Sequence, residues 1–191
     1  MKQPVRGQGK LKIKKKKVIK GNPFRKGIEK KHTQEYGTSQ LERDFARDFL
    51  DRLGLKYVYQ FEAKDIKRFF DFAVTAEENY PYKYIEKDGL MSIDQDAQLF
   101  IPNFLIEVDG DYWHGNPNMI DEKKGLSPMQ KHNKFIDKLK DEWCGMHCIP
   151  LLRIWENDIR RNPKKVTDMI CEYSSAARKR KMIMDNKKRP H

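Results

Sequence analysis

Residues 99–115 of the chain are Leu-Phe-Ile-Pro-Asn-Phe-Leu-Ile-Glu-Val-Asp-Gly-Asp-Tyr-Trp-His-Gly. The run from Leu99 to Val108 is the most apolar in the chain and predicts a buried strand, which the turn signal Asp109-Gly110 ends. Glu107 and Asp109 are two residues apart, so both side chains leave the same face of that strand. A carboxylate in a buried strand needs a charge partner or a metal ion, so these residues predict a polar site on a sheet.

Further strands and helices are predicted on both sides of this run. Ser39-Gln40-Leu41-Glu42 has the pattern of a capping box, and apolar residues at helical spacing continue from it to Gly54. Strands are predicted at 56–61, 68–74, 99–108 and 148–155, a hairpin or loop at 76–97, and helices from Ser127-Pro128 to about Glu142 and from Asn162-Pro163 onward. The order αβββαβα indicates an α/β fold with a mixed sheet flanked by helices.

The charge of the chain is unevenly distributed. Its 191 residues carry 40 Lys and Arg against 28 Asp and Glu, a formal charge of +12. Residues 1–32 hold 13 of the bases and one acid, and residues 178–191 hold seven bases and one acid, which leaves a body of net charge −6. We therefore expect a basic arm at 1–36 that is disordered when free, a folded domain at 37–177 and a basic, flexible tail at 178–191.

The two basic segments are predicted to bind a polyanion, because clustered lysines release counterions when they contact phosphates. A solubility or localisation role would also fit the arm, as would RNA or an acidic membrane face as its partner. The expected DNA contacts are Lys12, Lys14, Lys15, Lys16, Lys17, Lys20 and Arg25 in the arm, and Arg178, Lys179 and Arg180 in the tail.

Several classes of protein are not expected. No apolar run approaches the about 18 residues that a membrane helix needs, and the lysine-rich start lacks the apolar segment of a signal peptide. Cys144, Cys148 and Cys171 are too few for a disulfide framework and favour reduced thiols in the cytoplasm. Zinc binding by these cysteines with His147 is the alternative, but the paired spacing typical of a zinc site is missing, so buried thiols are the simpler interpretation.

Asp71 is a third acid in an apolar strand. If the strands at 68–74 and 99–108 are neighbours, Asp71, Glu107 and Asp109 meet at one end of the sheet, where a cation bound by oxygen atoms would relieve their repulsion. This is the chemistry of Mg²⁺-assisted phosphodiester hydrolysis, with His114 able to orient water or to protonate a leaving oxygen. The alternative is a simple turn at Asp109-Gly110 with Glu107 in solvent.

Five segments in order carry a resemblance to a known family: Ser39-x-x-Glu42, Arg68-Phe-Phe-Asp71-Phe, Ile106 to Gly115, Asn133-x-x-x-Asp137 and Leu152-Arg153-Ile154-Trp155-Glu156. Over about residues 39–160 the chain resembles the PD-(D/E)XK nuclease superfamily. Within it, the chain is most similar to the very-short-patch-repair endonucleases and their relatives among phage and intron homing endonucleases. The resemblance implies a restriction-endonuclease-like fold that acts on double-stranded DNA with Mg²⁺, for which Mn²⁺ can substitute, and without a small-molecule cofactor.

The resemblance implies a role for each matched residue. Asp71 is expected to be the central metal ligand, with Glu107 and the backbone carbonyl of Val108 completing the metal shell. Asp109 stands where the superfamily has a lysine, so it must act as a base, as a ligand of a second metal or as a partner of His114. His114 itself matches the second catalytic histidine of the repair group.

Four further residues have a functional and a plain interpretation. Glu42 matches a helix acid that faces the site, or it only completes the capping box. Asp137 matches an acid on the later helix, or it pairs with a lysine one turn away. Tyr112 and Trp113 match the aromatic pair that the repair enzymes insert into DNA, or they are core residues. Asp111 stands where a zinc cysteine of the repair group would fall, so no structural zinc is expected.

These observations favour a Mg²⁺-dependent endodeoxyribonuclease of the homing or phage type, in the cytoplasm of a bacterial or phage-infected cell. A homodimer is the simplest way for a chain of this length to cut both strands. The alternatives are a mismatch-directed repair nickase, a nuclease-like fold that binds nucleic acid without cleaving it, and a structural protein whose basic ends bind a genome.

Overall fold

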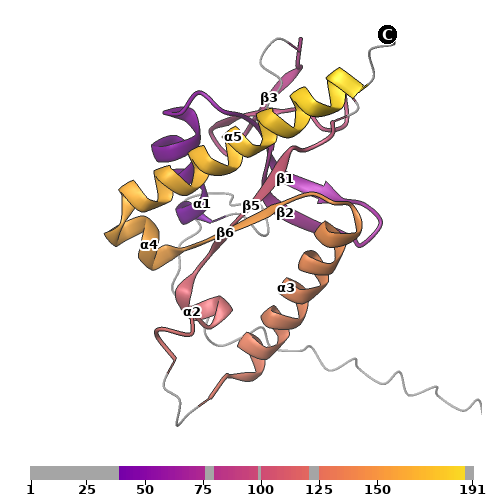
Figure 1. Ribbon diagram of the computed structural model, residues 1–191. Coiled ribbons are helices and arrows are strands. Elements are labelled where there is room, and N and C mark those ends of the chain that lie inside the picture. The colour runs from indigo at the N-terminus through magenta and orange to yellow at the C-terminus, as the bar shows by residue number, and fades with distance from the viewer. Residues whose placement is uncertain (1–38, 76–79, 99, 121–124, 188–191) are drawn as a thin grey trace, which may run out of the picture. The chain divides into compact units, whose positions relative to one another are not determined.

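The computed structural model describes residues 39–75, 80–98, 100–120 and 125–187, with side chains described up to residue 180 (Figure 1). Its main sheet has the order β1-β2-β5-β6, formed by β1 (Lys56–Ala63), β2 (Arg68–Thr75), β5 (Phe104–Asp109) and β6 (Leu151–Trp155). Neighbouring strands are antiparallel except for β5 and β6, which run parallel. This mixed sheet with helices around it confirms the predicted α/β fold.

Helices cover both faces of the sheet (Figure 1). One face carries α1 (Gln40–Phe45), which continues as the π-helix η2 (Ala46–Asp51), and the long helix α5 (Pro163–Lys187). The other face carries α3 (Pro128–Met146). The short helices α2 (Asp111–His114) and α4 (Glu156–Arg161) follow β5 and β6 directly.

The core has two parts, one on each face of the sheet. On the α1 and α5 face, Phe45, Leu50 and Val166 pack against strand residues that include Phe72 and Ile106. On the α3 face, Trp143 and Cys144 pack against Val58, Phe70 and Leu105. Because both faces bury apolar side chains, strands β2 and β5 read as nearly continuous apolar runs, as the sequence suggested.

The usual alternation of side chains breaks at one rung of the sheet, formed by Gln60 and Asp71. Tyr59 and Phe72 belong to the core on the α1 face, whereas Phe61 and Phe70, one step beyond the break, belong to the core on the α3 face. Gln60 has a φ of 54°, in the left-handed region that side chains other than glycine rarely adopt. Strands β1 and β2 are paired on both sides of this rung but not at it, so the sheet opens locally at Asp71.

A hairpin covers the free edge of β1. It consists of β3 (Tyr84–Lys87) and β4 (Leu90–Ile93) and confirms the hairpin predicted in 76–97. The Oγ atom of Ser92 accepts the N–H of Tyr59 at 2.9 Å, and the side chain of Gln95 exchanges two bonds with the backbone of Glu62. These bonds satisfy backbone groups that an edge strand would otherwise expose.

Several boundaries differ from the prediction. β5 begins at Phe104, because Pro102 cannot donate a backbone bond, and β6 begins at Leu151, because Cys148 turns the chain after α3 with a φ of 54°. The helices α2 and α4 were not predicted. The boundary placed between residues 177 and 178 lies inside α5, so the basic tail begins as helix and not as flexible chain.

The predicted arm at 1–36 lies outside the described residues. Within the described part of the chain, no helix combines the length and the apolar character needed to cross a lipid bilayer.

Candidate active site

Asp71 lies where β2 and β5 separate. The paired residues of these strands end at Phe72 and Ile106, and one step further the register brings Asp71 opposite Glu107. Asp71 Oδ2 accepts the backbone N–H of Val108 at 2.7 Å, so the carboxylate takes the place of a ladder bond. The structure therefore brings Asp71, Glu107 and Val108 together at neighbouring strands, as the sequence suggested.

Glu107 is buried, with 2 % of its surface exposed. Lys140, on α3, donates to both of its carboxylate oxygens, at 2.9 Å to Oε1 and 2.7 Å to Oε2. Sequence spacing does not indicate this lysine as a partner of Glu107, because it comes 33 residues later in the chain. The only signal available was its position three residues after Asp137, which puts both side chains on one face of the helix.

Glu42 turns its carboxylate inward from α1. Its backbone N–H is capped by the Ser39 hydroxyl, as predicted for the start of the helix. Its Oε2 atom accepts bonds from the Tyr59 hydroxyl at 3.1 Å and the Gln60 amide at 2.8 Å. Glu42 is therefore buried beside the Gln60–Asp71 rung, which agrees with an acid that faces the site.

The three acids raise one another's pKa. Burial, followed by the charge of Glu42, raises the pKa of Asp71 to about 7, although Lys140 opposes the shift. Burial and the charge of Asp71 raise the pKa of Glu107 to about 8, again against Lys140. Burial also raises the pKa of Glu42, with a contribution from Glu107. Lys140 offsets the shifts of Asp71 and Glu107 only in part, so the acids at this site outnumber the charge that the ammonium supplies.

Asp109 belongs to a second group of side chains on the same face. Its carboxylate is 2 % exposed at the end of β5, and Arg153 of β6 lies 3.0 Å from each of its oxygens. Arg153 also contacts Asp137 Oδ1 at 3.4 Å and Asp141 Oδ1 at 3.1 Å. Asp109 is therefore neither a plain turn residue nor a free base, because a permanent cation holds it.

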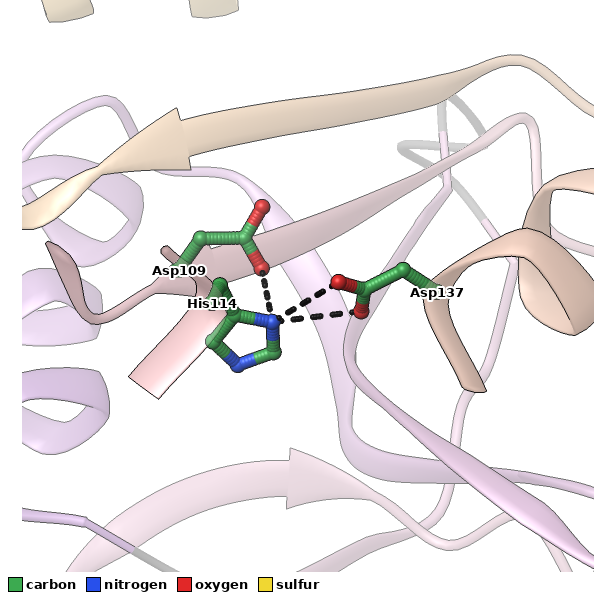
Figure 2. Close-up of side chains that lie close together, drawn as sticks. All are labelled: Asp109, His114 and Asp137. Carbon is green, nitrogen blue, oxygen red and sulfur yellow. Dashed lines mark hydrogen bonds and ion pairs between the residues drawn. The ribbon is translucent and has the colours of Figure 1, made fainter. Parts of the chain in front are cut away.

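His114 lies between Asp109 and Asp137 (Figure 2). Its Nδ1 atom is 3.0 and 3.2 Å from the two oxygens of Asp137 and 3.5 Å from Asp109 Oδ1. Because a carboxylate only accepts, Nδ1 carries the proton, and Nε2 lies on the opposite side of the ring, away from both acids. Asp137 pairs with His114 and Arg153, so the predicted alternative of a pair with a lysine one turn away is wrong.

The pKa of His114 reflects this setting. Burial alone would lower it, but the bond to Asp137 and the charges of Asp109 and Asp137 outweigh burial and raise it. In Asp137 burial raises the pKa, and His114 and Arg153 together lower it below the usual value for an aspartate. His114 therefore holds its proton more tightly than a free imidazole does, and Asp137 orients the ring.

The single turn of α2 exposes two aromatic rings next to His114. Tyr112 and Trp113 are 65 % and 54 % exposed, so they are not core residues. Gln130 and Asn133 of α3 donate to the backbone oxygens of Tyr112 and Trp113 at 2.6 and 2.8 Å. A short helix that would not be stable alone is thereby fixed to a long one.

The predicted DNA-binding residues fall into two sets. Lys12 to Arg25 lie outside the described residues. Arg178, Lys179 and Arg180 are exposed on α5, on the opposite face of the sheet from α3.

The donor atoms present fit a divalent cation. Mg²⁺ and Mn²⁺ prefer oxygen ligands, and Glu42, Asp71 and Glu107 supply an excess of carboxylate charge. Within the described residues, Asp71 Oδ1 accepts no hydrogen bond. Glu107 differs, because both of its oxygens bond to Lys140, so it would bind an ion through a remaining lone pair or in exchange for one of these bonds.

Neither models of protein families nor curated proteins nor solved structures give a match to this chain. Membership of the PD-(D/E)XK superfamily therefore stays a prediction from the sequence motifs.

Proposed function

We propose that the chain is a metal-dependent DNA endonuclease of the homing or phage type. The observation that carries the proposal is the pair of acids Asp71 and Glu107 on neighbouring strands, with Glu42 near enough to raise the pKa of Asp71, beside a histidine that an aspartate orients. A surplus of buried carboxylates and a proton donor at one end of a sheet are what metal-assisted phosphodiester hydrolysis needs.

Asp71 and the backbone carbonyl of Val108 would hold the metal ion, with Glu107 as the further acid that could exchange a lysine bond for it. When bound, the ion neutralises the scissile phosphate and lowers the pKa of an attacking water. Lys140 limits the repulsion between Asp71 and Glu107 and keeps both carboxylates directed into the site. We regard Lys140 as a positioning residue.

His114 supplies the proton-transfer group. Asp137 binds Nδ1 and fixes the tautomer in which Nε2 lies on the side of the ring away from both acids. In the proposal, Nε2 faces the leaving oxygen, and the raised pKa of the ring favours the protonated form that would donate to it.

Double-stranded DNA is the proposed substrate. The basic arm and the basic residues of α5 would offset the negative body, which on its own repels a polyanion. The exposure of Tyr112 and Trp113 beside His114 supports this substrate, because such rings would be free to enter the stacked bases at the scissile step. We place this activity in the cytoplasm of a bacterial or phage-infected cell.

Cleavage of supercoiled plasmid tests the proposal. The wild-type chain should nick or linearise the plasmid with Mg²⁺ or Mn²⁺, and EDTA should stop it. Asp71→Asn should lose cleavage and keep DNA binding in a gel-shift assay. Asp141→Asn, which changes an exposed aspartate on α3, is the matched control and should cleave. Cleavage by Asp71→Asn at the wild-type rate would exclude this site.

A non-cleaving nucleic-acid-binding module is the second candidate. One observation favours it: Asp109 occupies the expected lysine position and is held by Arg153, so it cannot polarise water. This candidate predicts that the wild-type chain binds the plasmid and leaves it intact with either metal.

A further inference from the structure

Arg153 is surrounded by acids that come from two other elements. Its Nη1 atom lies 3.0 Å from both oxygens of Asp109 on β5 and 3.4 Å from Asp137 Oδ1 on α3. Its Nη2 atom lies 3.1 Å from Asp141 Oδ1 and 3.3 Å from the backbone oxygen of Asp137. One guanidinium thus occupies the space between β5, β6 and α3. Its N–H groups donate to oxygen atoms of β5 on one side and of α3 on the other.

The same acids form a ligand set with His114. Within the described residues, Asp109, His114 and Asp137 are the one group of three potential metal ligands whose donor atoms all lie within 4.8 Å of one another (Figure 2). Two carboxylates and an imidazole bind divalent transition ions such as Mn²⁺. The cluster shares no residue with Glu42, Asp71 and Glu107, although the charge of Asp109 acts on Asp71 and Glu107.

A divalent ion and the guanidinium compete for this cluster. An ion bound to Asp109 and Asp137 would take oxygen atoms to which Arg153 is already bonded, and it would stand within a few ångströms of a charge that never titrates. It would also need the lone pair of His114 Nδ1, which in the present arrangement carries a proton toward Asp137.

We propose that Arg153 takes the place of a cation in the Asp109–His114–Asp137 cluster and prevents a divalent metal ion from binding there. The guanidinium neutralises the two acids without coordinating the histidine. His114 thereby keeps Nε2 available and remains a proton carrier instead of becoming a metal ligand. This last consequence rests on the proposed nuclease activity, but the exclusion of the metal ion does not.

Mn²⁺ binding tests the exclusion directly. Mn²⁺ is a suitable probe because the cysteines of the chain, being soft ligands, do not compete for it. The signal of free Mn²⁺ in electron paramagnetic resonance gives the number of ions bound per chain. Arg153→Gln should bind about one ion per chain more than the wild type, whereas Arg153→Lys, which keeps the charge, should bind the wild-type number. Adding Asp137→Asn to Arg153→Gln should remove the extra ion.

Two results would overturn the inference: an unchanged number of ions in Arg153→Gln, or loss of one ion when His114→Asn is made in the wild-type chain. Should Arg153→Gln not fold, Arg153→Gln/Asp141→Asn replaces it, because it removes an acid together with its partner and keeps the local charge. The test depends on the difference in the number of bound Mn²⁺ ions between the variants and the wild type, and not on the wild-type number itself. A wild type that binds no Mn²⁺ contradicts the proposed metal at Asp71 and leaves this inference intact.

Discussion

Lys140 on α3 donates to both carboxylate oxygens of Glu107 on β5, at 2.9 and 2.7 Å, in a setting where both side chains are buried. The ammonium comes from a helix, whereas the expected lysine position on the strand holds Asp109. Burial lowers the pKa of Lys140, but Glu107 and Asp71 more than offset this and raise it. Lys140 therefore holds its charge more tightly than a free lysine does, and it bonds to Glu107 while its charge also acts on Asp71.

Replacing Lys140 should destabilise the protein more at high pH than at low pH. At pH 6 Glu107 is protonated, and Lys140→Met removes two hydrogen bonds, at a cost of about 1–3 kcal/mol. At pH 9 the same change leaves a buried charge without a partner, which costs about 3–5 kcal/mol. Urea unfolding at both pH values measures the difference. Lys140→Met/Glu107→Gln serves as control, since it should lose the pH dependence.

The metal-free protein should lose stability as the pH rises from about 4.5 to about 8. Glu107 has a pKa of about 8 in the folded protein against 4.5 as the ordinary value, so the folded state binds the proton more tightly. Its contribution is fully present below pH 4.5 and is lost as the pH rises through 8. Thermal unfolding in EDTA should show this loss in the wild type and much less of it in Glu107→Gln. An unfolding temperature of the wild type that does not change between pH 4.5 and 8 would contradict the raised pKa of Glu107.

Asp137→Asn should lower the pKa of His114, because it removes the strongest interaction that favours the charged ring. NMR titration of the ring protons measures this shift without any assay of activity. If His114 donates a proton during cleavage, the alkaline limit of the reaction should move to lower pH in the same variant. Asp141→Asn, which does not contact His114, should leave both measurements unchanged.

Gln60→Gly should be more stable than Gln60→Ala by about 1 kcal/mol. Both variants lose the bond to Glu42, but only alanine keeps the strain of a φ of 54°. Chemical denaturation of the two variants gives the difference between their free energies of unfolding, which measures the cost of the backbone conformation at residue 60. Equal stability of the two variants would mean that the chain leaves the left-handed region once the glutamine side chain is gone.

Tyr112→Ala and Trp113→Ala should leave stability within about 0.5 kcal/mol, since both rings are mostly exposed. DNA binding should weaken by about 1–3 kcal/mol for each ring that stacks on a base. Fluorescence of 2-aminopurine next to the scissile step reports insertion. Phe135→Ala, a ring 64 % exposed on α3, is the matched control and should have no effect.

The sequence alone determined most of the local structure. The Ser39 and Ser127 caps, the apolar strands and the position of Asp71, Glu107 and Asp109 along them follow from residue type and spacing, and the structure has them close to where they were predicted. The mixed sheet also followed, because a helix between two strands favours a parallel pair, whereas the order β1-β2-β5-β6 within the sheet was not predicted. That Glu107 and Asp109 share a face needed only the period of a strand.

Only the tertiary structure decided which cations meet these acids. Lys140 lies 33 residues from Glu107 in the chain, and Arg153 lies 44 residues from Asp109. Over such separations, residue spacing does not predict which side chains come into contact or which face of the sheet they occupy. A basic residue within the apolar strand at 151–155 was a signal for Arg153, but it did not indicate the partner. An ion pair between distant segments depends on how β5, β6 and α3 pack together, and packing is a property of the whole core. The acids were thus visible in the sequence, whereas their neutralisation by Lys140 and Arg153 appeared only once the chain was folded.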